Sequence, residues 1–168
     1  NNVAVGKGAL TQNTTAHRSV AVGFEALKNS AVVGNSNASN VGVGYQAGTA
    51  LTSGISNVFV GAHSGDATTS GGQNTALGLG SLGANTTASN NTAVGYYALT
   101  ANTTGTRNTA VGESALVSNT TGVYNSATGY RTLYYNTTAD SNTGYGMQAL
   151  YQNTTGASNT AVGESSLY

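Results

Sequence analysis

Cysteine, proline and tryptophan are absent from this chain, and charged residues make up only 6% of its 168 positions. Without cysteine, the chain forms neither a disulfide nor a thiolate metal site. Basic and acidic residues number five each, so there is no basic stripe of the kind that binds nucleic acid. No apolar run is long enough to span a membrane. Helix is disfavoured as well, because Gly, Thr and Asn are poor helix formers and no window shows a sustained 3.6-residue apolar pattern.

The most informative feature is a repeated phrase, clearest at Asn91 ("NTAVGYYALTANTTG") and Asn108 ("NTAVGESALVSNTTG"). Each copy carries a glycine just after its first apolar run. These framework glycines are Gly6, Gly23, Gly44, Gly61, Gly78, Gly95, Gly112, Gly129, Gly146 and Gly163. Successive framework glycines lie 17 residues apart, except for Gly23 and Gly44, which lie 21 apart. This fixed register argues against disorder and indicates stacked structural units.

Each repeat position has a physical role. The residue before the framework glycine is mostly Val, in a short β-branched run that favours a strand. The glycine permits a tight bend or a positive φ. Asn recurs four residues before it and again in the "NTTG" corner, where it tolerates turns and can form a ladder between copies. One copy is therefore expected to form strand, bend, short strand and corner.

The repeat predicts an all-β fold, a parallel β-solenoid of about ten coils that forms one domain over residues 1–168. The framework glycines are expected to form one line along it. Because strand residues alternate between faces, Ala in the middle of each strand and Val beside it point in opposite directions. With Ala inside, a column of Val faces outward and needs a partner, which predicts an oligomer. The opposite arrangement, with Val inside, stays open.

The phrase "N-T-A-V-G-x-x-A-L", with "NNVAVG" at Asn1 and "NSA" at Asn125, resembles the head repeats of YadA-like trimeric autotransporter adhesins. It is also similar to NTAVG-type repeats of bacteriophage tail fibres. The resemblance implies a left-handed β-roll and a parallel homotrimer, although this repeat is longer than that of the adhesin heads. It also implies an extracellular setting, on a virion tail fibre or on a bacterial cell surface.

The expected function is that of a structural and adhesive fibre segment, excerpted from a longer protein and most in keeping with a phage tail fibre that attaches to a host surface. The alternatives are a bacterial adhesin head and, in another class, a self-contained sugar- or ice-binding solenoid. The expected partners are further copies of the chain and a host-surface glycan or receptor, without nucleic acid or membrane insertion. Enzymatic activity, a cofactor and a metal are not expected.

Tyrosines gather toward the C-terminal end. Tyr134, Tyr151 and Tyr168 recur every 17 residues, so their rings are expected about 5 Å apart on adjacent coils, with Tyr135 beside them. Tyrosine is enriched at contact surfaces, and these four residues are the candidate receptor contact. The alternative is that the stacked rings only cover the roll or seal the trimer.

Several motif-like spellings are better explained by the repeat. "GLGSLG" (78–83) matches a dinucleotide-binding loop but lacks the strand and helix that such a loop connects. "HSGD" (63–66) places His, Ser and Asp side by side, where their side chains are expected to diverge. Asp140, Asn142 and Gly144 suggest a calcium loop without its closing Glu.

Three further features leave alternatives open. The longer interval holds four extra residues within 28–40, expected to form either a loop on one face or a slightly larger corner. Threonines of the corner also form columns that an ice-binding surface would need, although they lie in a corner and not on a flat strand; they include Thr14, Thr15, Thr86, Thr87, Thr103 and Thr104. The N-x-S/T spellings would carry glycans only in a eukaryotic secreted protein; they begin at Asn13, Asn37, Asn85, Asn90, Asn102, Asn119, Asn136 and Asn153.

Overall fold

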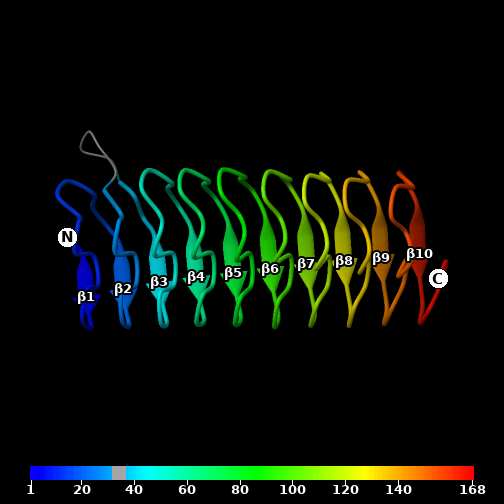
Figure 1. The fold of residues 1–168 in the computed structure, drawn as a ribbon, viewed down its shortest axis with the longest axis horizontal. Coiled ribbons are helices and arrows are strands. Elements are labelled where there is room, and N and C mark those ends of the chain that lie inside the picture. The colour runs from blue at the N-terminus through cyan, green and yellow to red at the C-terminus, as the bar shows by residue number, and fades with distance from the viewer. Residues whose placement is uncertain (32–36) are drawn as a thin grey trace.

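The computed structural model describes residues 1–31 and 37–168, which form an elongated rod of stacked coils with the two chain ends at its opposite ends (Figure 1). Each coil contributes one short strand, and the ten strands form a single parallel sheet in chain order. They are β1 (Val3–Val5), β2 (Val20–Val22), β3 (Val41–Val43), β4 (Val58–Val60), β5 (Thr75–Leu77), β6 (Thr92–Val94), β7 (Thr109–Val111), β8 (Ser126–Thr128), β9 (Thr143–Tyr145) and β10 (Thr160–Val162). The chain makes about 9 turns of a β-solenoid, which confirms the predicted fold class.

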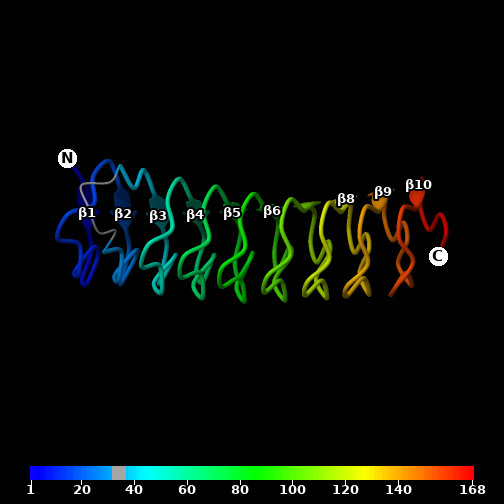
Figure 2. The same ribbon diagram turned by 90° about the horizontal axis from the view of Figure 1, so that it is seen from above.

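The strand register follows the repeat, so residues at one repeat position form a column along the rod (Figure 2). Ala93 of β6, for example, pairs with Ala110 of β7. Val20 of β2 pairs with Val41 of β3, so the columns continue in register across the longer interval. Residues 32–36 of the segment 28–40 lie outside the described residues, and the loop or larger corner predicted there stays a prediction.

The prediction of a second short strand in each coil is wrong for the described residues. After the framework glycine the chain runs through consecutive turns, in which left-handed residues alternate with others. In the sixth coil, Tyr97 and Leu99 both have a φ of 52°, which curls the backbone too tightly for a strand. The N–H groups still reach the next coil, since Leu99 donates to the carbonyl of Ala115 at 2.9 Å.

The alanine columns fill the inside of the coil. The middle strand residues Ala21, Ala93 and Ala110 are fully buried, whereas the first and third residues of β6 and β7 are half-buried or exposed. Leu99 and Leu116, from the turn after the framework glycine, complete the core. The arrangement with Ala inside and Val outside is therefore confirmed.

Two ladders of buried asparagine also run along the rod. In the first, Asn108 Oδ1 accepts a hydrogen bond from the backbone N–H of Asn125 at 2.9 Å, and Asn108 Nδ2 donates to the carbonyl of Gly122 at 2.8 Å. In the second, Asn119 Nδ2 donates to Asn102 Oδ1 at 3.0 Å and to the same Gly122 carbonyl at 3.1 Å. Buried amides are costly unless hydrogen-bonded. The ladders satisfy them and tie each coil to the next at a fixed height.

The framework glycines form one line down the rod, as predicted. Gly95 has a φ of +137°, and a Cβ on it would lie 2.5 Å from the carbonyl oxygen of Gly112 in the next coil. Both the conformation and the close approach require glycine.

One large side chain interrupts the alanine column. Phe59 of β4 is fully buried, and Gly48 and Gly65 stand where most other coils carry a leucine. A Cβ on Gly48 would lie 2.6 Å from the Phe59 ring, and one on Gly65 would meet the same ring. The core volume is conserved because the larger strand residue is matched by smaller residues at the turn.

Candidate binding surfaces

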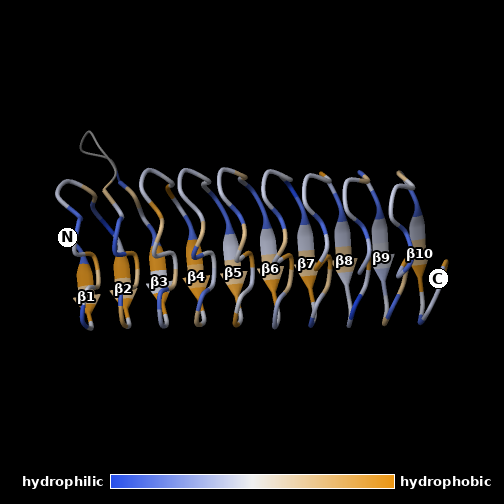
Figure 3. Ribbon diagram, viewed as in Figure 1, coloured by the Kyte–Doolittle hydropathy of each residue, from blue (hydrophilic) through white to orange (hydrophobic). Residues whose placement is uncertain are grey.

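The strands β1 to β10 lie side by side along the length of the rod (Figure 3). We define their first and third residues, which flank the middle residue of each strand, as the outer strand face. Over β1 to β4 this face consists of Val3, Val5, Val20, Val22, Val41, Val43, Val58 and Val60. From β5 onward the first residue is Thr or Ser, while Leu77, Val94 and Val111 continue the apolar third column. Leu77 is 47% exposed. Thr128 of β8 interrupts this column, which is apolar from Val5 to Val111. An exposed apolar column of that length is typical of an interaction surface.

The four candidate tyrosines do come together. The ring centroids of Tyr134 and Tyr151 lie 5.2 Å apart, as do those of Tyr151 and Tyr168, which confirms the predicted ring spacing. Tyr135 stands nearly perpendicular to Tyr134 and to Tyr151, at 76° to each. A hydrogen bond with Tyr151 raises the pKa of the Tyr135 phenol above its ordinary value.

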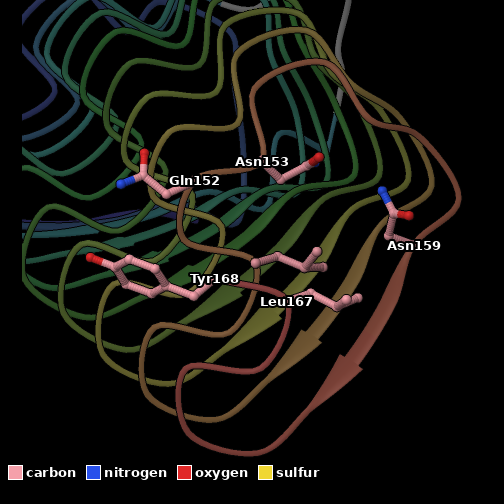
Figure 4. A pocket seen from close by; sticks show the side chains of 6 residues that line it. Gln152, Asn153, Asn159, Leu167 and Tyr168 are labelled. Carbon is pink, nitrogen blue, oxygen red and sulfur yellow. The ribbon is translucent and has the colours of Figure 1, made fainter.

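The tyrosine column lies on a different side of the coil from the strands. Seen along the rod, Leu167 extends toward the strands while the ring of Tyr168 extends to the opposite side (Figure 4). A hollow of about 260 Å³ at this end of the rod is lined by Leu150, Gln152, Asn153, Asn159, Leu167 and Tyr168. Tyr168 is the one residue of the tyrosine column that borders this hollow, and the other five lining residues come from other columns of the last coils.

Arg131 joins these tyrosines, a contact that the sequence analysis missed. Its guanidinium carbon lies 4.9 Å from the ring centroid of Tyr130 and 5.5 Å from that of Tyr134. Arg131 has a φ of 53°, and the direction of its side chain depends on that left-handed turn. A signal was nevertheless present, because Arg131 lies between Tyr130 and the pair Tyr134–Tyr135 in the sequence.

A second aromatic stack near the N-terminal end was also missed. The rings of Phe24 and Tyr45 are stacked at 5.2 Å, and the His63 ring meets Tyr45 edge-on at 5.3 Å. Lys7 Nζ lies 6.0 Å from the Phe24 ring centroid. Phe24 and Tyr45 occupy the same repeat position, but the differing residue types along that column conceal the stack in the sequence.

A small polar network adjoins this stack. Lys28 Nζ lies 2.7 Å from Glu25 Oε1, and Gln46 Nε2 donates to Glu25 Oε2 at 3.0 Å. The hydrogen bond from Lys28 and then that from Gln46 hold the pKa of the Glu25 carboxyl below its ordinary value. The Glu25 carboxylate is thus held by hydrogen bonds from Lys28 and Gln46 of the same chain.

The short sequence motifs that resemble catalytic or ligand-binding sites are explained by the repeat structure. His63 Nδ1 lies 3.0 Å from Asp66 Oδ2, but Ser64 Oγ donates to the carbonyl of Gly61, so the three side chains do not converge. Asp140 Oδ1 accepts the backbone N–H of Val123 at 2.7 Å. Asn142 belongs to the first asparagine ladder, where its Nδ2 donates to the Gly156 carbonyl at 2.8 Å. Segment 78–83 forms a bend and turns.

Within residues 1–31 and 37–168, no group of three or more His, Cys, Asp or Glu is placed to hold a metal ion. The same residues contain no helix that is long and apolar enough to cross a membrane. Comparison with models of protein families, with curated proteins and with solved structures found no match.

Proposed function

We propose that this chain is a segment of a structural and adhesive fibre, most in keeping with a phage tail fibre that attaches to a host surface. A bacterial adhesin head of the trimeric autotransporter type is the second setting. In both, three copies associate in parallel and in register through left-handed coils, as the resemblance implies. The proposed location is extracellular, on a virion or on a bacterial cell surface.

The outer strand face is the observation that carries this proposal. Its valine and leucine columns are apolar and partly exposed in a single chain, as at Val58 and Leu77. A parallel trimer about the rod axis would bring the same columns of each chain together at every level. Because each coil adds length without changing the cross-section, such a trimer would be a spacer that places a contact surface away from its anchor.

An ice-binding solenoid is less favoured because the hydroxyl groups of one threonine column form hydrogen bonds between coils. Thr86 Oγ1 donates to the carbonyl of Thr103 at 3.3 Å, and Thr103 Oγ1 donates to that of Thr120 at 3.1 Å. These hydroxyl protons are therefore directed along the rod and not toward water. We expect no thermal hysteresis from the purified chain, and clear hysteresis would favour the ice-binding alternative.

Sedimentation equilibrium tests the assembly. We expect the mass of three chains at micromolar concentration. Substituting Val22→Lys together with Val43→Lys should dissociate the assembly, because the new charges would be buried at the seam. The matched control, Thr87→Lys with Thr104→Lys, changes the corner and should leave the mass unchanged. A stable, well-folded monomer for the unaltered chain would refute the trimer.

Binding to bacterial cells and to isolated surface polysaccharide tests the adhesive role. Tyr134→Ser, Tyr135→Ser and Tyr151→Ser in one variant should abolish binding with an unchanged melting temperature. Tyr96→Ser with Tyr97→Ser is the matched control, because these rings also meet edge-on, at 4.5 Å. Loss of stability alone would assign the C-terminal tyrosines to the scaffold. The full-length gene decides the setting, through a virion-attachment domain or an outer-membrane anchor.

A further inference from the structure

The surface around Arg131 combines one cation with several aromatic rings. We define the Arg131 cluster as Arg131 with Tyr130, Tyr134, Tyr135 and Tyr151. The guanidinium contacts the rings of Tyr130 and Tyr134. Tyr134 also stacks on Tyr151, and Tyr135 stands against both of these rings. The cluster thus spans two adjacent coils on one side of the rod.

The guanidinium is held in place but has no anionic partner. Among the residues that the structure describes, Arg131 makes no ion pair and no side-chain hydrogen bond, and its Nε is buried without a partner. Contact with two rings restricts the orientation of the planar group. An arginine fixed in this way offers a fork of donors that matches a carboxylate or phosphate bidentately.

The rings supply the second half of a binding surface. Tyr134, Tyr151 and Tyr168 cover one another's faces through stacking. Tyr135 is perpendicular to the stack and 42% exposed, so it can offer flat ring surface to a ligand. Tyrosine combines such an apolar surface with a hydroxyl that donates and accepts hydrogen bonds, as the C–H and hydroxyl groups of a sugar ring require.

The geometry points to an acidic saccharide as the ligand of the Arg131 cluster. The anionic group of one sugar residue binds the Arg131 guanidinium, and a neighbouring part of the saccharide packs against Tyr135. This inference rests on the proposed adhesive function and names the chemical class of its receptor. Glu113 is the acidic residue one coil earlier, in the column of Tyr130, and it forms no ion pair with Arg131.

Arg107 provides an internal comparison. Its guanidinium carbon also lies over a tyrosine ring, at 5.2 Å from the centroid of Tyr124, but its Nη1 donates to the Tyr124 hydroxyl at 2.6 Å. Among residues 1–31 and 37–168, Tyr124 is the one ring that the Arg107 guanidinium contacts, and one of its donors is already used. Both arginines occupy left-handed positions, with φ of 59° at Arg107 and 53° at Arg131.

Glutamine is a suitable replacement at both sites. Gln46 and Gln148 occupy the repeat position of Arg131, and Gln73 occupies that of Arg107, all three with positive φ. Arg131→Gln and Arg107→Gln should therefore fold as the unaltered chain does. A thermal melt of each variant checks this before any binding measurement.

Calorimetric titration with an oligogalacturonate, whose sugar residues carry carboxylates, tests the inference on the full assembled chain. The carboxyl-reduced form of the same oligosaccharide and polyaspartate are the comparison ligands. We expect binding of the oligogalacturonate, weakened by salt, and reduced about tenfold or more in Arg131→Gln. Arg131→Lys should be intermediate because it keeps the charge and loses the planar fork. Arg107→Gln should bind normally.

Three results would overturn the inference. They are equal binding of the acidic and reduced saccharides, equal binding by Arg131→Gln and the unaltered chain, and equal binding of polyaspartate, which would indicate a general anion surface. A chain that binds cells but not the oligogalacturonate would refute the acidic-saccharide ligand and leave the adhesive function standing. A chain that binds neither would count against both.

Discussion

At the scale of single residues, two kinds of positive φ shape the coil. The framework glycines lie between +121° and +138°, a region that residues with a side chain avoid. The turn residues cluster near 50° to 60°, where Leu99 and Tyr97 are found. That left-handed conformation costs about 1–2 kcal/mol per residue for an ordinary side chain. Because every coil repeats it, stacking between coils must impose it.

Gly95→Ala should destabilise the chain by more than about 1 kcal/mol, because alanine does not fit a positive φ and its Cβ would meet the Gly112 carbonyl oxygen at 2.5 Å. Chemical denaturation measures the change. Gly83→Ala is the control, since Gly83 has no positive φ and its repeat position holds Thr100 and Tyr134 in other coils. A control as damaging as Gly95→Ala would contradict the explanation.

The requirement for glycine in the framework column could be predicted from the sequence, but the left-handed leucines could not. Leucine alone favours no such conformation, so the segment after the framework glycine reads as a second strand. The column contains a clue, because Gly48 and Gly65 replace leucine there with φ of 60° and 56°. Glycine exchanged for leucine at a fixed repeat position indicates a positive φ that stacking imposes on the larger residue.

At the scale of the coil, the asparagine ladders stabilise the fold and also fix the register of each coil against the next. Asn108→Ala removes the acceptor of the Asn125 N–H and one of the two donors to the Gly122 carbonyl. A buried N–H left without a partner costs about 1–3 kcal/mol, and we expect a loss of that size in denaturant unfolding.

Asn108→Ser should be milder than Asn108→Ala. Ser19 already stands in this ladder, and its hydroxyl accepts the backbone N–H of Asn40 at 3.3 Å. A serine at position 108 would retain that bond while losing the donor to Gly122. Equal losses for the two variants would show that the ladder acts through side-chain volume and not through hydrogen bonding.

Phe59 and Gly65 should behave as an interdependent pair. Phe59→Ala leaves a cavity and should cost about 3–5 kcal/mol, and Gly65→Leu alone should also destabilise, because the Phe59 ring occupies the space. The double variant restores the pairing of Ala93 with Leu99 found in another coil and should recover much of the loss. A double-mutant cycle measures the coupling, and additive losses would contradict it.

At the scale of the whole molecule, each strand contacts the strands beside it in the stack, and the buried alanines and leucines form one core that runs from coil to coil. The period predicts the stacking of the coils and the ring spacing of the tyrosine column, whereas it left open whether the alanine or the valine column faces inward. The nearness of Arg131 to Tyr130 and Tyr134 in the sequence was a signal, but their contact could not be predicted from the period, because it depends on the direction a side chain takes from a left-handed turn. A period specifies which residues form a column, but not how side chains of adjacent columns meet.

Deleting residues 91–107, one full repeat, should therefore give a shorter rod with the same fold, because Asn90 would then precede Asn108 as it now precedes Asn91. Circular dichroism should show the same spectrum per residue, with a similar melting temperature. Deleting only residues 91–98 would place apolar residues in the polar columns and should prevent cooperative folding. A full-repeat deletion that unfolds the chain would refute the independence of the coils.

The parallel stacking also determines how the rod carries load. Its termini lie at opposite ends (Figure 1), and the hydrogen bonds between coils join each coil to the next along that same direction. A pulling force on the two ends therefore acts first on a terminal coil. The hydrogen bonds of that coil to its neighbour break before those of the next coil are stretched. Each peeled coil of 17 residues releases roughly 55–60 Å of chain. A single chain under tension would therefore lengthen in equal steps, one coil at a time. Association with other copies would make the rod stiffer, because each coil would then also be held by the neighbouring chains.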